Sequence, residues 1–284
     1  MRQVGVIAMA MALAAAALLI TGDGGTAVSA TAQQPSGDRL NLGVVAIDAR
    51  IGDRRVRSSG TVIDGRAGLV ATSAHTVWGA TSLRLTTGLG ILHGRLVARA
   101  PCAGIAVIEI QPRIPGLVAL PAAVGGPPAR TELLSAVGRR EEGLGGLLTI
   151  PLRTAGTVAK AKFENGLPPL TGAMRLDGAV VPESSGGPLV NSDGELVGMA
   201  MATTTGSGER GALAIPWATV QQRLGELEVD KRQIYVGWRD YYRCAPALHA
   251  YARREHPGYR PIDAVINAPV PATRLPGTQT LDSQ

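Results

Sequence analysis

Two short segments carry residue types that together can activate a hydroxyl group as a nucleophile. Ser185 is followed by Gly186, Gly187 and Pro188 in the segment SSGGPLVN, and His75 ends the segment LVATSAH. A serine hydroxyl attacks a carbonyl carbon poorly until an imidazole removes its proton. A glycine-containing turn also directs backbone N–H groups at the negative charge that develops on the carbonyl oxygen. The two segments therefore predict a nucleophile, Ser185, with His75 as its general base.

The order and context of these segments resemble those of the trypsin-like serine peptidases, most of all their exported bacterial HtrA-like branch. The similarity runs from about Val44 to Leu224 and includes DGELVG at 193–198 and AIP at 214–216. The resemblance implies two six-stranded chymotrypsin-type β-barrels with the active site in the cleft between them. It also implies that the substrate is a peptide or a protein.

Two positions depart from the pattern of this family. The aspartate of the catalytic triad begins a strand that reads DLAVL in relatives, and here that position is Gly104. Neither Glu109 on the same strand nor Asp177 is an evident substitute. Relatives also have glycine two residues before the nucleophile, where its N–H and that of Ser185 form the oxyanion hole, and here that residue is Glu183. Because each loss slows acyl transfer by orders of magnitude, the sequence predicts an impaired serine endopeptidase. The alternative is an inactive pseudoprotease that binds peptides or proteins.

The resemblance also indicates a side-chain preference. In this family the residue six positions before the nucleophile lies at the base of the primary pocket, and here it is Ala179. A substrate arginine or lysine would find no acidic partner there. Small or medium apolar substrate side chains are therefore expected.

The elements that must position these residues are short strands. Apolar runs such as GVVAID, GTVIDG and GIAVIEI are separated by glycine and polar residues, and spacings of roughly 8–12 residues are typical of sandwiches and barrels. A proline- and glycine-rich segment, residues 112–128, precedes a second β-rich set. The sequence predicts an all-β peptidase domain over residues 42–228, with barrels over about residues 42–111 and 129–217.

The pattern changes after the second barrel. A helical spacing of apolar residues predicts a C-terminal helix over about residues 218–228. All five tyrosines lie in residues 229–268, which predict a short helical extension that covers the barrels, with a binding site as the alternative. Residues 269–284 are expected to form a disordered tail.

The N-terminal residues have the three parts of a secretory signal peptide. Arg2 precedes an uncharged apolar run over residues 4–20, and small residues (VSA) occupy positions 28–30. This layout predicts export to the medium or the cell envelope, removal of residues 1–30 and a linker over residues 31–41. The alternative is an uncleaved anchor, although the alanine-rich run is short for a membrane span.

Composition argues against several other classes of protein. Apolar residues make up 45% and charged residues 18% of the chain, which excludes a disordered protein. The net charge of +6 is scattered and includes no basic block with aromatic residues, so no nucleic-acid partner is expected. The four histidines lack the spacing of a metal site, and no cofactor is predicted. The sequence leaves the oligomeric state open.

The chain has two cysteines, Cys102 and Cys244. In an exported protein this pair predicts one long-range disulfide. Two unpaired buried thiols are the alternative.

Overall fold

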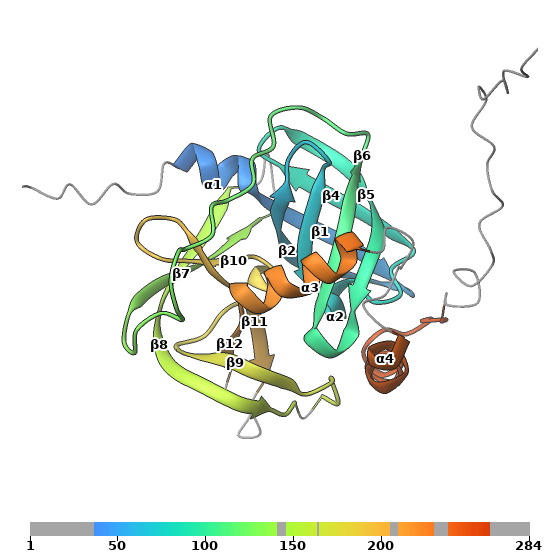
Figure 1. Cartoon of the computed structure of the whole chain (residues 1–284). Coiled ribbons are helices and arrows are strands. Elements are labelled where there is room, and N and C mark those ends of the chain that lie inside the picture. Colours follow the sequence, from blue (N-terminus) through green and yellow to red (C-terminus); the bar gives the residue numbers. More distant parts are fainter. Residues whose placement is uncertain (1–36, 141–145, 164, 205–209, 230–237, 262–284) are drawn as a thin grey trace, which may run out of the picture. The chain divides into compact units, whose positions relative to one another are not determined.

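Two closed antiparallel β-barrels of six strands each dominate the described part of the computed structural model (Figure 1). The first barrel has the strand order β1-β2-β3-β6-β5-β4, and the second has the order β10-β11-β12-β9-β8-β7. This architecture confirms the predicted all-β double barrel. The structure describes residues 37–140, 146–163, 165–204, 210–229 and 238–261, all of them within one compact unit.

The strands of the first barrel are β1 (Val44–Ile51), β2 (Arg54–Asp64), β3 (Leu69–Ser73), β4 (Ser82–Thr87), β5 (Gly90–Ala100) and β6 (Ile105–Gln111). Those of the second barrel are β7 (Leu133–Arg139), β8 (Leu147–Ala161), β9 (Leu170–Asp177), β10 (Pro188–Val190), β11 (Leu196–Thr204) and β12 (Arg210–Pro216). The pairs β1–β4 and β7–β10 close the two barrels.

Strand β6 shows why these apolar runs form a barrel next to a second apolar surface. Its sequence, IAVIEIQ, is buried at every position except the last. Ile108 and Ile110 belong to the core of the first barrel, whereas Ile105 belongs to a cluster with Val137 and Met199 of the second barrel. Burial of apolar area is the main favourable contribution to folding, and here it also joins the two barrels.

Helix α1 (Gly37–Gly43) occupies positions where the sequence predicts the end of a linker. Leu40 in this helix is buried in the cluster that joins the barrels. This apolar contact, together with the hydrogen bond of 2.7 Å that Arg139 donates to the side-chain oxygen of Asn41, holds the segment against the barrels. The predicted signal peptide at residues 1–30 and the predicted tail at residues 269–284 lie outside the described residues.

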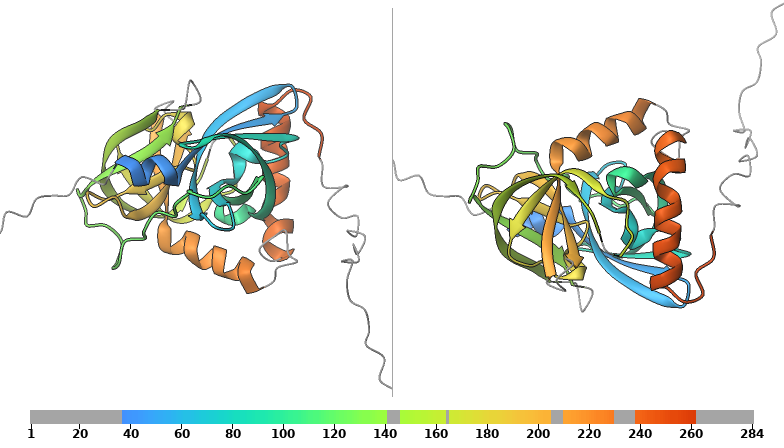
Figure 2. Two further views of the ribbon diagram at one scale, coloured as in Figure 1. Left: turned by 90° about the horizontal axis from the view of Figure 1, so that it is seen from above. Right: turned by 90° about the horizontal axis from the view of Figure 1, so that it is seen from below.

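Three further α-helices are α2 (Ala74–Val77), α3 (Trp217–Val229) and α4 (Trp238–Glu255), and two short 3-10 turns are η1 (Pro101–Ala103) and η2 (Pro182–Ser184). Both views in Figure 2 show α4, in red, alongside the strands of the first barrel. Ala245, Leu248 and Ala252 of α4 accordingly belong to the core cluster of that barrel. The C-terminal extension is thus helical, as predicted. Among the described helices, none has the length and apolar character that a membrane crossing requires.

Candidate active site

The turn that carries Ser185 packs directly against two strands of the first barrel. The N–H of Ser59 on β2 donates a hydrogen bond to the carbonyl of Ser185, at 2.9 Å. Gly186 has φ +83°, and a Cβ atom at this position would lie 2.2 Å from Thr72 Oγ1 and 2.7 Å from the nitrogen of Ser73. Glycine is therefore required here by both backbone conformation and space. The predicted nucleophile lies against β2 and the end of β3.

His75 follows β3 after a single residue, in the short helix α2. The N–H of Ala74 donates a hydrogen bond of 2.8 Å to the carbonyl of Gly104. Residue 104 therefore adjoins the helix that carries His75, and Ser73 adjoins the Ser185 turn. The structure brings the three positions read as a triad to one junction between the barrels.

Gly104 has a left-handed backbone conformation at the end of η1, with φ 71° and ψ 20°. A Cβ atom at this position would lie 3.2 Å from Leu170 Cδ2 and 3.4 Å from Ile215 Cδ1. Side chains other than glycine, asparagine and aspartate rarely adopt this conformation. Glycine at position 104 therefore suits the left-handed conformation of the backbone.

Glu109 is engaged away from this junction. Its carboxylate accepts hydrogen bonds from Arg113 at 2.7 Å and from Arg95 at 2.6 Å. These two bonds, that of Arg113 first, hold the pKa of Glu109 below its usual value. Glu109 therefore has an ion-pairing role on β6, in agreement with its rejection as a triad member.

The backbone before Ser185 forms a closed turn. The N–H of Ser185 donates to the carbonyl of Pro182 at 3.0 Å, and the N–H of Ser184 donates to that of Val181 at 2.9 Å. Glu183 lies inside this turn at negative φ, since Thr131 is the one non-glycine residue with positive φ among those described. An oxyanion hole needs backbone N–H groups directed at the substrate oxygen. In this structure the Ser185 N–H is occupied by Pro182 instead.

The C-terminal extension packs against His75, whose side chain is half-buried. The ring of Tyr251 on α4 meets the His75 ring edge-on, with centroids 6.0 Å apart, and His256 lies 6.1 Å beyond Tyr251 in the same edge-on arrangement. Burial lowers the pKa of His75 from 6.5 to about 4, and His256 adds a smaller electrostatic effect in the same direction. His75 is therefore neutral at pH 7, able to accept a proton, but a weak base.

Comparison with known proteins agrees with this geometry. A family model described as a trypsin-like peptidase domain matches residues 58–199, half of the 284-residue chain. The chain belongs to the trypsin-like peptidase family. Its match with the HhoA protein of Synechocystis sp. (strain PCC 6803), a serine-protease homologue by its name, is 29% identical over 151 residues. That match covers 52% of this chain and only 37% of the relative, so the chain spans well under half of that protein.

Solved structures of bacterial proteases share the fold. The serine endoprotease of Yersinia pestis has a TM-score of 0.55 and 21% identity, over 69% of this chain and 67% of that chain. The active form of the Rv3671c protease of M. tuberculosis has a TM-score of 0.58 and 20% identity, over 73% and 93%. The MamO protease domain of Magnetospirillum magneticum has a TM-score of 0.54 and 23% identity, over 65% and 96%. At these identities the likeness shows the fold.

In this member of the trypsin-like peptidase family, a disulfide and two hydrogen bonds to one histidine fix the extension. Cys102 and Cys244 are joined, with their Cα atoms 5.2 Å apart, so α4 is tied to η1, next to Gly104. Trp78 Nε1 donates to His249 Nδ1 at 3.3 Å, and the hydroxyl of Tyr259 also bonds to this nitrogen. Because the indole N–H only donates, Nδ1 is the unprotonated nitrogen of His249.

Sequence reasoning missed Tyr251 and His256 as neighbours of the site. The one available signal was the concentration of tyrosines after residue 229, and it gives no partner. Ala179, predicted at the base of the primary pocket, is exposed in the segment between β9 and η2. A separate pocket of about 320 Å³ beside the Ser185 turn is lined by residues that include Arg57, Arg139 and Glu183.

The junction itself yields a stability prediction at Ser59. Its buried hydroxyl donates to the carbonyl of Glu183 at 2.7 Å and accepts the N–H of Arg139 at 3.0 Å. Ser59→Ala is expected to lower the free energy of unfolding by about 2 kcal/mol, because two buried backbone groups lose their partner. Denaturant titration measures this change.

The neighbouring Ser58 is a matched control. It is also buried, but within the described part of the chain its hydroxyl has no hydrogen-bond partner. Ser58→Ala is therefore expected to change stability by less than about 0.5 kcal/mol. Equal losses from both substitutions would contradict the role assigned to Ser59.

Proposed function

We propose that the chain is an exported serine-type endopeptidase homologue that reacts through Ser185 and His75 and hydrolyses peptide bonds at a reduced rate. One observation supports this most: the Ser185 turn bonds to β2 at 2.9 Å and lies against the end of β3, and Ala74, next to His75, bonds to the carbonyl of Gly104 at 2.8 Å. Substrates are peptides or proteins with a small or medium apolar residue opposite Ala179. No cofactor is required.

In the proposed reaction the Ser185 oxygen bonds to the scissile carbonyl carbon while His75 takes the hydroxyl proton. The C–N bond then breaks, His75 returns that proton to the leaving amine, and water hydrolyses the resulting ester by the same steps. Two features of this chain slow these reaction steps. Nothing at Gly104 stabilises the His75 imidazolium, and the Ser185 N–H must leave the Pro182 carbonyl before it can bind the oxyanion.

A pseudoprotease that binds peptides or proteins is the second candidate. The hydrogen bond from Ser185 N–H to Pro182 and the cover that Tyr251 forms over His75 favour it. Both features describe a cleft that is closed to acyl transfer as it stands.

Labelling with a fluorophosphonate separates the two candidates, because phosphonylation needs an activated serine and no substrate-specific pocket. We expect slow, stoichiometric labelling that mass spectrometry assigns to Ser185. Ser185→Ala should abolish it, and His75→Gln should slow it at least about tenfold. If the folded wild-type protein never labels at Ser185 but binds peptides, the pseudoprotease is correct.

Export is tested separately by N-terminal sequencing of protein from the culture medium or envelope of the native host. The mature chain is expected to begin at Thr31 or Gln33, after either small-residue cleavage site. Recovery of a chain that begins at Met1 would contradict cleavage.

A further inference from the structure

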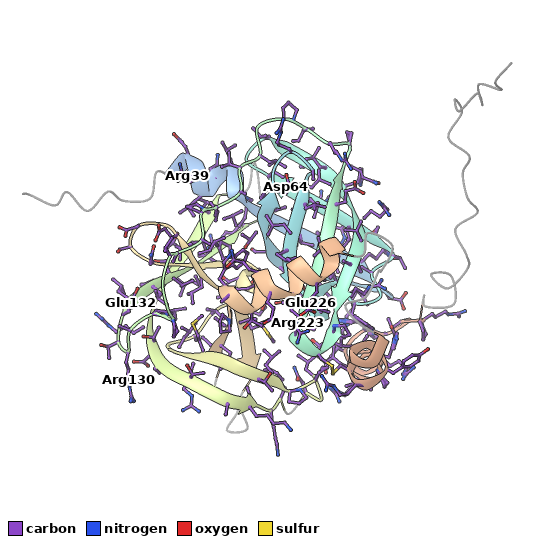
Figure 3. The ribbon with its side chains drawn as sticks, in the orientation of Figure 1. Arg39, Asp64, Arg130, Glu132, Arg223 and Glu226 are labelled. Carbon is purple, nitrogen blue, oxygen red and sulfur yellow. A yellow bond between two sulfur atoms is a disulfide. The ribbon has the colours of Figure 1, made fainter. Side chains whose placement is uncertain are left out.

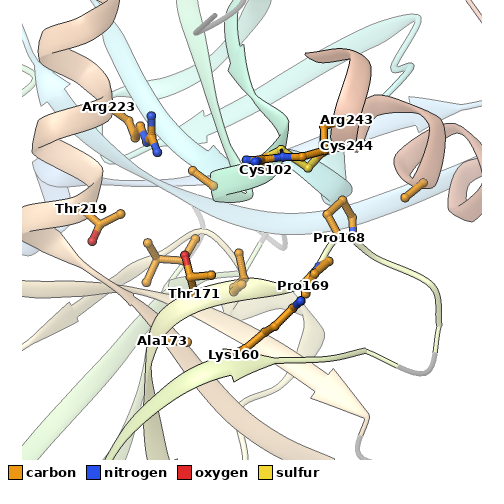
Figure 4. A pocket seen from close by; sticks show the side chains of 14 residues that line it. Cys102, Lys160, Pro168, Pro169, Thr171, Ala173, Thr219, Arg223, Arg243 and Cys244 are labelled. Carbon is orange, nitrogen blue, oxygen red and sulfur yellow. Dashed lines mark hydrogen bonds between the residues drawn. A yellow bond between two sulfur atoms is a disulfide. The ribbon is translucent and has the colours of Figure 1, made fainter. Parts of the chain in front are cut away.

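Figure 4 shows the lining of a pocket of about 330 Å³. Two of its lining side chains lie next to Gly104, the residue at the position of the triad aspartate. Its wall includes Leu170 and Ile215, the two side chains nearest to a Cβ atom at Gly104. Strands of the second barrel, helix α3, turn η1 and helix α4 all contribute to the lining, together with the Cys102–Cys244 disulfide. The pocket therefore lies where the C-terminal extension meets both barrels.

Three cationic side chains line this pocket: Lys160 from β8, Arg223 from α3 and Arg243 from α4. The Nε of Arg243 donates to the sulfur of Cys102 at 3.3 Å, which holds its guanidinium beside the disulfide. Arg223 pairs with Glu226 at 2.9 Å on the same helix (Figure 3). Among the described lining residues none carries a carboxylate, and Lys160 and Arg243 bring cationic groups to two different walls of the pocket.

The rest of the lining is mainly apolar. Leu170, Ile215 and Ala173 come from the second barrel, and Ala247 comes from α4. Pro168 and Pro169 also line the pocket, near Lys160 in the view of Figure 4. A concave, mostly apolar lining with a few convergent polar groups is the usual composition of a small-molecule site.

We propose that this pocket binds a small organic anion, a carboxylate attached to a short apolar chain. The carboxylate lies between Lys160 and Arg243, where charge-assisted hydrogen bonds are available, and the chain lies on Leu170 and Ile215. This site goes beyond the proposed peptidase activity and does not depend on it, since none of its residues takes part in the reaction of Ser185.

Titration of the full chain with a series of probes tests the proposal: acetate, butyrate, hexanoate, hexylammonium and inorganic phosphate. Amide NMR shifts identify the site, and Thr171 and Ala247 should move. Hexanoate is expected to bind at least about tenfold more tightly than acetate, because each buried methylene adds to affinity. Hexylammonium should bind more weakly than hexanoate because its head group is positively charged. Phosphate should bind more weakly because it has no apolar chain.

Substitutions locate the charge and the cavity. Lys160→Gln and Arg243→Gln should each weaken hexanoate binding about fivefold. The matched controls are two exposed cations that do not line the pocket, Lys162 after β8 and Arg253 on α4. Their glutamine variants should change binding less than about twofold. Thr171→Trp, at an exposed position of the lining, should block binding without lowering the melting temperature.

The outcomes are decisive in either direction. Saturable hexanoate binding that responds to these three substitutions establishes the site. Equal binding of hexanoate and hexylammonium would show a non-specific apolar surface, and equal binding of hexanoate and phosphate would show a simple anion site. Either of these two results would overturn the proposal. Unaltered binding in Thr171→Trp, or a lack of saturation by about 10 mM hexanoate, would overturn it as well.

Discussion

Lowering the pH from 7 to 4 is expected to reduce the free energy of unfolding by about 3 kcal/mol through His75 alone. Burial lowers the pKa of this imidazole in the folded protein from 6.5 to about 4. Between these two values the unfolded chain binds the proton and the folded chain does not. The stabilising contribution of His75 is therefore fully present well above pH 6.5. It falls as the pH is lowered toward 4, with a slope of up to about 1.4 kcal/mol per pH unit.

Urea titrations at several pH values measure this slope, and comparison with His75→Gln isolates the contribution of His75. The lowered pKa values of His256 and Glu109 affect both proteins alike. His93→Gln is the control, since His93 is exposed on β5, and its slope should equal that of the wild type. Parallel curves for wild type and His75→Gln between pH 4 and 6.5 would show that His75 is not buried in this way.

Removal of the Tyr251 ring tests whether its contact with His75 lowers the pKa of that histidine. Tyr251→Ala should let water reach His75 and flatten the pH dependence of stability, because the pKa of His75 then returns toward 6.5. Tyr242 lies on the same helix with 71% of its surface exposed, so Tyr242→Ala should leave the slope unchanged. The pair distinguishes loss of the cover from a general effect on α4.

The fold was predictable because its signals are local. Alternating apolar runs with glycine and polar residues between them specify short strands. β1 and β6 begin and end close to the runs GVVAID and GIAVIEI, whereas β2 begins at Arg54, well before the run GTVIDG. The segment around Ser185 was recognisable for a similar reason. Position 186 must be glycine because a side chain there would collide with Thr72 and Ser73. The packing requirement is therefore visible in the sequence motif itself.

The state of the site was not predictable because it depends on contacts between distant segments. Tyr251 reaches His75 only because α4 packs on the first barrel, and no periodicity in the sequence states that pairing. The hydrogen bond from Ser185 to Pro182 depends on backbone angles that the SSGGP motif does not specify. The order of α1 likewise follows from tertiary contacts, those of Leu40 with the cluster between the barrels and of Asn41 with Arg139.

Gly104→Asp is expected to accelerate fluorophosphonate labelling of Ser185 at least about tenfold, although by less than the ~10⁴ that the aspartate contributes in an intact triad. A carboxylate at this junction would stabilise the His75 imidazolium and raise the pKa of His75 from about 4. Residue 104 adopts φ 71°, which aspartate tolerates better than most residues, at a cost of about 1 kcal/mol. Labelling kinetics as a function of pH measure both effects.

Gly104→Asn is the matched control for this substitution, because asparagine has the same size and the same tolerance of the left-handed conformation but no charge. Both variants meet Leu170 and Ile215 in the same way, so their stabilities should agree while only the aspartate accelerates labelling. Adding Glu183→Gly to Gly104→Asp should increase the rate again, since glycine permits the backbone change that releases the Ser185 N–H from Pro182. If the folded aspartate variant labels no faster than the asparagine variant, residue 104 does not lie behind His75 as a third triad member would. Ser185 and His75 would then lack the geometry that a carboxylate could complete.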